Sequence, residues 1–432
     1  MTNTDDEVVQ LCSDLIRIDT SNPVKTERPA AEYVAAKLSE VGLEPTLLES
    51  EHGRASVVAR IEGEDSSRGA LLIHGHLDVV PADPNDWRVH PFSGEIEDGC
   101  VWGRGAVDMK DMDAMTLAVV RKRLREGRRP PRDVVLAFLA DEEAGGTYGA
   151  RWLIDTHPDL FEGCTEGIGE VGGFSYSVNE DLRLYVVEVA EKGMAWMRLT
   201  ARGRAGHGSM INDDNAVVTL TDAVARLGRY EWPIRLTPTV RAFLTEVSAA
   251  TGLNLDLDDE AGLRDAVTKL GPIARVVGAT LRNTTSPTML DAGYKVNVVP
   301  QTATARIDGR FLPGYEEEFS DTLDEILGSD VERIVEHTDI ALETSFDGPL
   351  LDAMRTALQA EDPSSRIVPY CLSGGTDAKS FSRLGIRCFG FAPLRLPPSL
   401  DFTAMFHGVD ERVPVDALRF GVRVLDRFLD AC

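Results

Sequence analysis

One segment of the chain reads Leu71-Leu72-Ile73-His74-Gly75-His76-Leu77-Asp78-Val79-Val80, so that an apolar run leads directly into two histidines and an aspartate. Such a run predicts a strand with its polar residues at the far end. Because side chains alternate between the faces of a strand, we expect His74, His76 and Asp78 on one face. At this spacing a carboxylate can orient an imidazole that binds a metal ion. A buried structural histidine explains the same pattern.

The length and charge of the chain limit its class. A chain of 432 residues is too long for one ordinary core and predicts two or three domains. Lys and Arg number 45 against 71 Asp and Glu, which gives a formal net charge of −26. This charge repels phosphate backbones and anionic lipid surfaces, so we expect no nucleic acid and no membrane partner.

The termini and cysteines predict a reduced, cytoplasmic protein. The segment from Met1 to Glu7 is polar and acidic, unlike a secretory signal or a transit peptide. No run of about 18 apolar residues is present that would span a bilayer. The six cysteines are scattered without a Cys-x-x-Cys pair, which argues against a disulfide framework and against a thiolate zinc site.

Helical and strand patterns alternate over the first part of the chain, and this alternation predicts an α/β layer architecture. The strand at 132–140 is continuously apolar, as in strands that are buried on both faces. Asp111 or Asp113 is placed to cap the predicted helix at 114–125. The predicted helices are 5–18, 29–41 and 114–125, and the other predicted strands are 45–48, 56–61 and 70–77.

The pattern changes near Leu182 and predicts a small α+β sandwich inserted into the first domain. We therefore expect one domain at 1–190 and 340–432, interrupted by a smaller domain at 191–339. The segment 231–271 has no pattern that we can interpret. The inserted domain is predicted from strands at 184–189, 195–201, 294–299 and 302–311 and helices at 213–227 and 316–327; helices at 350–360 and 415–429 and a strand at 386–391 complete the first domain.

Three acids, Asp141-Glu142-Glu143, end the apolar strand at 132–140. Burying acids is costly unless a cation or hydrogen bonds compensate them. Adjacent residues project in different directions, so one glutamate can bind a metal ion while its neighbour removes a proton from water. A solvated acidic turn is the alternative.

Three further residues are candidates for the same chemistry. Asp108 lies in a glycine-containing segment, Trp102 to Lys110, and its two carboxylate oxygens can bridge two cations. Glu170 precedes Val171-Gly172-Gly173, and by itself it reads as an ordinary exposed glutamate. His407 lies in a loop ahead of the last helix and is uninformative alone.

Together these segments resemble the M20 metallopeptidases, which include aminoacylases, carboxypeptidases of the S and G types, acetylornithine deacetylase and succinyl-diaminopimelate desuccinylase. The resemblance implies a two-domain α/β fold, in which a catalytic domain at 1–190 and 340–432, with a mixed sheet flanked by helices, is interrupted by a smaller α+β lid of the dimerisation type at 191–339. The matching stretches, in the family's order, are Gly75 to Pro81, Gly103 to Lys110, Asp141 to Glu143, Glu170 to Gly173 and His407 to Glu411.

The resemblance also implies a pair of metal ions bridged by Asp108. Two imidazoles and three carboxylates suit zinc, and the same set accepts cobalt or manganese. His74 does not fall on a ligand position of the family and is interpreted as structural. The implied roles are His76 and Glu170 on one ion, Glu143 and His407 on the other, Glu142 as the general base, and Asp78 as the residue that orients His76.

In the inserted domain, His207 falls on a position that reaches into the other subunit's site in dimeric relatives and stabilises the oxyanion there. This position suggests a homodimer through the lid; the alternative is that the long insertion in the lid supplies such contacts within one chain. The alternative readings are that His207 is a surface histidine, that Asn297 belongs to a turn and that Arg310 forms a salt bridge within the lid. The positions that match substrate-carboxylate contacts of the family are Asn297, Arg310 and the glycine loop Gly374, Gly375 and Thr376.

Glu170-Val171-Gly172-Gly173 resembles the acid-x-Gly-Gly of the carboxypeptidase S and aminoacylase-like branch. Our hypothesis is a two-metal amidohydrolase that cleaves the amide bond of an N-acyl amino acid or short peptide with a free carboxylate. A phosphoesterase is an alternative, but the motif stretches offer only Arg104 and Lys110 to phosphate. The second alternative is a non-catalytic binding protein that retains the fold. Loss of Glu142 or of an implied ligand would indicate it, and none of these residues is missing.

Overall fold

A computed structural model describes residues 4–253, 255–258, 262–264 and 277–432. The chain divides into two compact units. The first contains Met1–Val189, Thr344–Pro369 and Thr376–Cys432, and the second contains Ala190–Glu343 and Tyr370–Gly375. Their limits lie close to the expected domains 1–190, 191–339 and 340–432. That these units are a catalytic domain and a lid stays a prediction.

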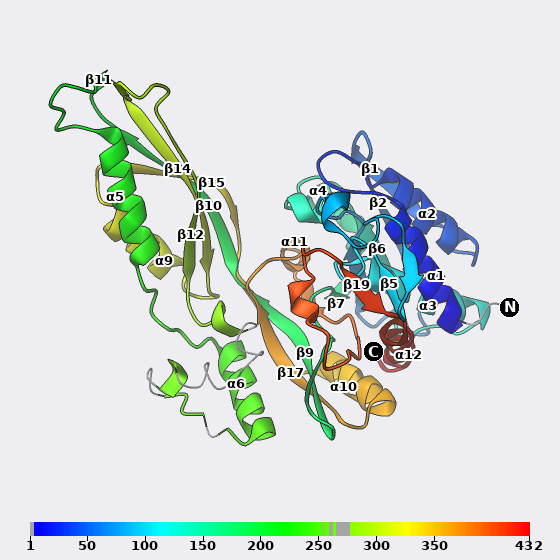
Figure 1. Cartoon of the computed structure of the whole chain (residues 1–432). Coiled ribbons are helices and arrows are strands. Elements are labelled where there is room, and N and C mark those ends of the chain that lie inside the picture. The colour runs from blue at the N-terminus through cyan, green and yellow to red at the C-terminus, as the bar shows by residue number, and fades with distance from the viewer. Residues whose placement is uncertain (1–3, 254, 259–261, 265–276) are drawn as a thin grey trace. The chain divides into compact units, whose positions relative to one another are not determined.

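The first unit is built on a mixed sheet in the order β1-β2-β6-β3-β7-β18-β9, with β8 and β17 also paired to β9 (Figure 1). The neighbours β6, β3, β7 and β18 run parallel, whereas β1, β2 and β8 pair antiparallel. Every residue of β3 and β6 is buried. The strands are β1 (Thr46–Glu51), β2 (Arg54–Ile61), β3 (Ala70–His76), β6 (Val134–Leu139), β7 (Cys164–Gly169), β8 (Ser175–Asn179), β9 (Leu182–Glu191), β17 (Ser365–Leu372) and β18 (Arg387–Gly390).

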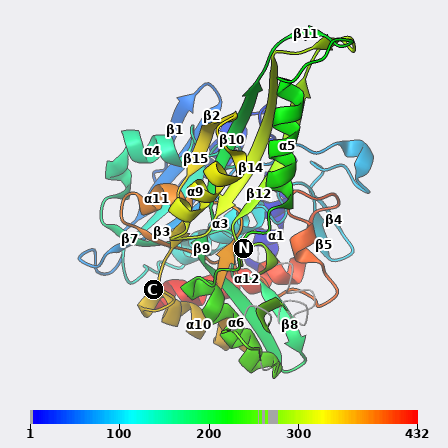
Figure 2. The same ribbon diagram turned by 90° about the vertical axis from the view of Figure 1, so that its left-hand side faces the viewer.

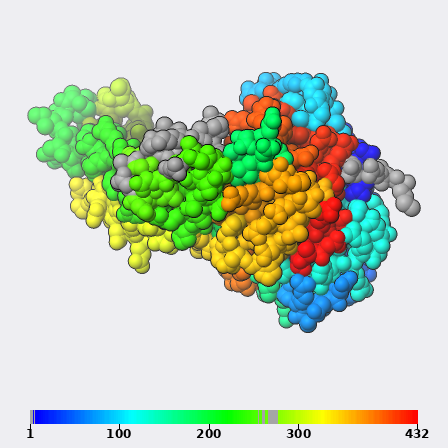
Figure 3. All heavy atoms as spheres, turned by 90° about the horizontal axis from the view of Figure 1, so that it is seen from below, coloured from blue at the N-terminus to red at the C-terminus, as the bar shows by residue number. Residues whose placement is uncertain are grey.

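Helices flank this sheet, as the α/β class predicts. The last helix, α12, contacts α1, α3 and α10, and Figure 3 shows the surfaces of α10 and α12 side by side. A small sheet, β19-β5-β4, lies in the same unit. The elements are α1 (Thr4–Arg17), α2 (Arg28–Ser39), α3 (Lys110–Arg125), α4 (Ala150–Thr156), α10 (Pro349–Glu361), α11 (Ala378–Ser382), α12 (Val415–Ala431), β4 (Glu95–Glu97), β5 (Cys100–Trp102) and β19 (Arg412–Pro414).

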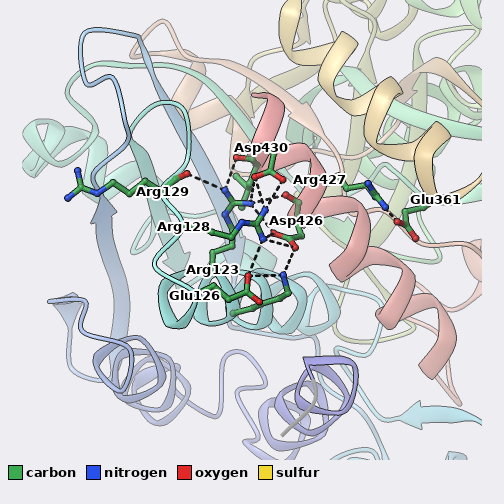
Figure 4. Close-up of polar contacts among 10 residues, drawn as sticks. Arg123, Glu126, Arg128, Arg129, Glu361, Asp426, Arg427 and Asp430 are labelled. Carbon is green, nitrogen blue, oxygen red and sulfur yellow. Dashed lines mark hydrogen bonds and ion pairs between the residues drawn. The ribbon is translucent and has the colours of Figure 1, made fainter. Parts of the chain in front are cut away.

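A network of ion pairs joins the end of α3 to α12 (Figure 4). The buried Arg123 donates to Asp426 and Asp430 at 2.9 and 3.0 Å. Arg128 donates to the same two carboxylates. Basic residues at the end of α3 thus meet acidic residues near the end of α12, and the pairing stabilises the contact between the two helices.

The third helix differs from its prediction at the amino-terminal end. It begins at Lys110 rather than at residue 114, and its capping position, Met109, makes no side-chain cap hydrogen bond. Asp111 and Asp113 lie inside the first turn with exposures of 2% and 1%. The expectation that one of them caps the helix is wrong, because the helix starts before them.

The second unit is a four-stranded antiparallel sheet in the order β12-β14-β10-β15. Residues along β14 alternate between buried and half-buried, so one face of the sheet is covered. Figure 2 shows α5 and α9 on one face, and their apolar residues share a core with it. The elements are β10 (Gly193–Arg202), β11 (Gly206–His207), α5 (Ala216–Arg229), α6 (Pro238–Thr251), β12 (Thr284–Ala292), β13 (Val298–Val299), β14 (Thr302–Phe311), α9 (Glu316–Leu327), β15 (Val331–Asp339) and β16 (Leu342–Glu343).

One predicted strand of this unit is wrong. The partners of β14 are β10 and β12, and only Val298–Val299 of the predicted strand 294–299 is extended, in a short pair with β11. Gly293, with φ +74°, follows β12 and turns the chain away from it. The sequence patterns did not indicate β12, β15 or β17.

The segment 231–271, left without interpretation above, contains α6. Thr237 caps this helix by accepting a hydrogen bond from the backbone N–H of Val240. Residues 254, 259–261 and 265–271 of the segment lie outside the described part of the chain. Among the residues that the structure describes, no helix has both the length and the apolar content needed to cross a membrane.

Candidate metal centre

Three parallel strands bring acidic and imidazole side chains to one edge of the first unit's sheet. His76 ends β3, Glu142 and Glu143 lie in the turn after β6, and Glu170 follows β7. Because β6, β3 and β7 are adjacent and parallel, their carboxyl ends meet at the same edge. Sheet pairing therefore gathers side chains from segments far apart in the sequence.

A first cluster consists of His76, Asp108 and Glu170. The Nε2 atom of His76 lies 3.1 Å from Oδ1 of Asp108 and 3.4 Å from Oε2 of Glu170. Potential ligand atoms of the three residues all lie within 4.8 Å of one another. The side chains of His76 and Glu170 are only 1% and 9% exposed.

A second cluster consists of Asp108, Glu143 and His407. The Nε2 atom of His407 lies 3.0 Å from Oε2 of Glu143 and 3.3 Å from Oδ2 of Asp108. Asp108 thus turns one oxygen to each cluster. Unlike the other members, the His407 side chain is 56% exposed.

These two clusters fit a pair of divalent cations. Oε1 of Glu143 is buried and has no hydrogen-bond partner among the described residues. Burial raises the pKa of Glu170 to about 7, which means that the site disfavours an unpartnered carboxylate. Hydrogen bonds to Asp108 and Glu143 raise the pKa of His407 to about 10, so without a metal ion the protonated imidazole supplies positive charge between these two carboxylates. Nitrogen and carboxylate oxygen donors in this number suit zinc, cobalt or manganese.

The hydrogen bonds of Asp78 differ from the expectation. Nδ1 of His76 is 2.9 Å from the backbone carbonyl oxygen of Asp78, whereas the nearest carboxylate oxygen is 3.7 Å away. The carboxylate instead accepts from the backbone N–H groups of Glu142 and Glu143 and from the side chain of Asn22. Asp78 therefore holds His76 through its backbone, and its charge is used to hold the acidic turn.

Glu142 lies beside the first cluster, with Oε2 at 4.0 Å from Nε2 of His76. Burial raises its pKa well above the usual range and the charge of Glu170 adds to this, while His76 opposes it. A nearby cation would lower the pKa again. Asp377 adds a further negative charge close to Glu142, and its buried Oδ2 has no hydrogen-bond partner among the described residues.

Left-handed backbone conformations occur at three non-glycine residues of this centre. The φ angles are 72° at Asp141, 58° at Val171 and 57° at His407. Such conformations are uncommon, and for a β-branched residue such as valine they are strained. They adjoin or coincide with Glu142, Glu170 and His407, which indicates that the surrounding structure forces these loops into place.

His74, in contrast, has the surroundings of a packing residue. It is 4% exposed, and its ring centroid lies 5.1 Å from that of Phe381. Its ring also packs so closely on Gly169 that no side chain fits at that position. Burial lowers the pKa of His74 to about 3, so the ring is neutral at pH 7.

Sequence reasoning missed a buried network beneath the centre. Arg54 forms an ion pair with Glu27 at 3.1 Å, donates to Oδ1 of Asn22 at 2.5 Å, and donates to Asp141. Asn22 in turn donates to Asp78 at 2.5 Å. In the sequence, Ser21-Asn22-Pro23 indicates only the end of a helix, and no local pattern marks Arg54.

The residues expected to contact substrate from the lid belong mostly to the second unit. His207 and Asn297 are exposed there, and Arg310 pairs with Asp308 at 2.7 Å, which is the lid salt bridge of the alternative interpretation. Roles in substrate binding stay predictions for all six positions. The second unit contains His207, Asn297, Arg310, Gly374 and Gly375, whereas Thr376 belongs to the first.

The fold agrees with comparisons to known proteins. A family model described as "Peptidase family M20/M25/M40" matches residues 72–431. The chain belongs to peptidase family M20/M25/M40. "Probable carboxypeptidase S-like 2" of Dictyostelium discoideum is 30% identical to it, over 83% of this chain and 71% of that protein.

Two further proteins extend the comparison over almost the whole chain. "N-fatty-acyl-amino acid synthase/hydrolase PM20D1" of Xenopus tropicalis is 25% identical over 96% of this chain and 84% of its own length. The crystal structure of an M20 family metallo-carboxypeptidase, Sso-CP2 from Sulfolobus solfataricus, matches with a TM-score of 0.74 at 19% identity, over 99% of each chain. This M20 chain is therefore a hydrolase of the metallopeptidase and amidohydrolase type. Neither a phosphoesterase nor a non-catalytic binding protein is favoured.

Proposed function

We propose that this M20 enzyme is a two-metal amidohydrolase that cleaves the amide bond of N-acyl amino acids or short peptides with a free carboxylate. The observation that supports it most directly is Asp108, whose two oxygens face separate clusters completed by His76 and Glu170 and by Glu143 and His407. The relatives support the substrate class, since one is an N-fatty-acyl-amino acid synthase/hydrolase and another a probable carboxypeptidase S-like protein.

Zinc is the metal that we propose, with cobalt or manganese as compatible substitutes. Divalent ions in such a site lower the pKa of water and polarise the carbonyl group that is attacked. His76 would offer Nε2, because its Nδ1 is directed at the carbonyl oxygen of Asp78. His407 would offer Nε2 on the opposite side of Asp108.

Glu142 would act as the general base. Its turn is held by the backbone hydrogen bonds from Glu142 and Glu143 to Asp78, so its carboxylate is positioned without being a member of either cluster. Glu142 would take a proton from the attacking water and deliver it to the leaving amine nitrogen. Its burial beside Glu170 supports this role, because both features favour acceptance of a proton.

We extend the proposal to the substrate's carboxylate and to the assembly. Arg310 and Asn297 would bind that carboxylate, with backbone donors from Gly374, Gly375 and Thr376. His207 would stabilise the oxyanion in a homodimer formed through the lid. We also propose a cytoplasmic location, which is supported by the six cysteines, since none of them forms a disulfide in the described part of the chain.

The test combines metal analysis of the purified protein with an activity screen. The substrates are N-acyl amino acids of different chain length, dipeptides, the same compounds with the carboxylate amidated, and phosphate esters. We expect about two metal ions per chain and turnover only of amides with a free carboxylate. Turnover of phosphate esters alone, or full activity after complete metal removal, would refute the proposal.

A further inference from the structure

The loop that carries His407 is not fixed by the burial of His407 itself. That side chain is 56% exposed, and both His407 and Asp410 have left-handed φ angles, of 57° and 56°. Packing around an exposed ring does little to hold it. The position of this histidine therefore depends on contacts that the loop makes beneath it.

Arg104 makes those contacts from the loop that precedes Asp108. It is 3% exposed and donates to the carbonyl oxygen of Gly408 at 2.9 Å. It also donates to Oε2 of Glu411 at 2.7 Å. Its guanidinium lies 5.2 Å from the ring centroid of Trp87, which fixes the plane from which the two hydrogen bonds are made.

Glu411, in the loop that carries His407, binds in turn to the loop that precedes Asp108. It is fully buried, and its second oxygen, Oε1, accepts a hydrogen bond from the backbone N–H of Val107 at 2.8 Å. Val107 directly precedes Asp108. The backbone carbonyl of Glu411 also accepts from the N–H of Gly103 at 2.9 Å. One ion pair therefore binds the backbone of both loops.

We propose that the Arg104–Glu411 pair positions His407 relative to Asp108 and so sets the metal affinity of the cluster Asp108, Glu143 and His407. This rests on the two-metal function proposed above. The metal affinity of the first cluster should depend on the pair much less, because His76 and Glu170 are buried and lie at the ends of adjacent strands. Arg104 and Glu411 are positioning residues, and neither belongs to either cluster.

The chemistry of the pair explains why other residues would not replace it. The planar fork of arginine donates to a carboxylate and a carbonyl at once, whereas a lysine ammonium is a point charge. Breaking a buried ion pair leaves the remaining charge without compensation. Glu411→Gln keeps the shape of the side chain, and Arg104→Lys keeps the charge while it loses the fork.

The experiment measures zinc binding to the metal-stripped full chain by titration calorimetry and by elemental analysis at defined free zinc. For Arg104→Gln and Glu411→Gln we expect one site of unchanged affinity and a second site weakened by about 10- to 100-fold. Arg104→Lys should give an intermediate loss, and it also serves as the test should the glutamine variants fail to fold.

The matched control is Arg123→Gln. Arg123 is as buried as Arg104, with 4% side-chain exposure for each, but it pairs with Asp426 and Asp430 in the network between α3 and α12. This variant should lower the melting temperature and keep both zinc sites. A purely structural role for Arg104 would give the same result in both variants.

The outcomes separate this inference from the proposed function. Two zinc sites of unchanged affinity in every Arg104 and Glu411 variant, with two sites in the unmodified protein, would refute the positioning role alone. Equal weakening of both sites would also refute it. Fewer than two sites in the unmodified protein would refute the two-metal function, and the positioning role with it.

Discussion

The carboxylate of Asp78 accepts a hydrogen bond from the backbone N–H of Glu142, with 3.1 Å between Oδ1 and the nitrogen. Its other oxygen accepts from the N–H of Glu143 at 3.0 Å. Asp78 follows β3 and the two glutamates follow β6, so one side chain joins the ends of two adjacent strands. The charge of Asp78 therefore fixes the turn that carries the proposed base and one proposed ligand.

Replacement of Asp78 by asparagine should loosen this turn. An amide has only one acceptor oxygen, so at least one of the two backbone N–H groups loses its partner. We expect metal affinity or kcat to fall about 10- to 100-fold. Zinc titration and steady-state kinetics measure the two effects. Asp133→Asn is the control, since Asp133 also accepts from a backbone N–H, that of Gly63, but belongs to neither cluster, and its replacement should leave both quantities unchanged.

Glu142→Gln should separate catalysis from metal binding. Glutamine keeps the size of the side chain but accepts no proton from water at neutral pH. We expect kcat to fall by about 10²- to 10⁴-fold, with the zinc content of the protein unchanged. Ordinary turnover by a fully metal-loaded Glu142→Gln protein would exclude Glu142 as the general base.

Metal affinity should rise with pH. Without metal, hydrogen bonds to Asp108 and Glu143 raise the pKa of His407 to about 10, and the pKa of His76 is raised because Glu170 and Asp108 outweigh its burial. Both rings then hold protons at pH 7, and a metal ion must displace them. We expect proton release in calorimetry with buffers of different ionisation enthalpy. The affinity for zinc should therefore fall as the pH is lowered from about 10, and an affinity that stays constant between about pH 9 and about pH 6 would argue that His407 is not a ligand.

The raised pKa of His407 also predicts how the stability of the metal-free protein depends on pH. The pKa of His407 is higher in the folded chain than the value of about 6.5 expected for an unfolded one. Its pairing with Asp108 and Glu143 therefore stabilises the fold fully below about pH 6.5, and this contribution is lost as the pH rises through about 10. Denaturation of metal-free His407→Asn across this range should lack that part of the pH dependence.

Loss of Arg54 should destabilise the protein more than loss of an exposed arginine on the same strand. Arg54→Gln leaves Glu27, which is fully buried, and Asp141 without their cation. We expect about 3–5 kcal/mol of lost stability. Arg60→Gln is the control, because Arg60 is 36% exposed in its pair with Asp133 and should cost about 0–1 kcal/mol. Urea unfolding at one fixed zinc concentration compares the two, and equal losses would contradict the buried network.

Several features of this protein follow from its sequence alone. Apolar runs at 70–77 and 132–140 indicated β3 and β6, and the positions of His76 and of Asp141-Glu142-Glu143 at their ends indicated where polar chemistry would gather. The α/β class and the M20 family are confirmed. These features are readable because strand alternation, helical periodicity and short motifs are local properties of a chain.

The tertiary structure alone decided which distant groups meet. Arg54 and Asp141 are 87 residues apart, and Arg104 and Glu411 are 307 apart. No local pattern relates such residues, because sheet pairing and loop packing bring them together. The same reason explains why β12, whose place as the partner of β14 depends on pairing, was missed. The resemblance of the sequence to the M20 family thus indicated the proposed ligands, and only the folded chain decided which buried side chains hold them.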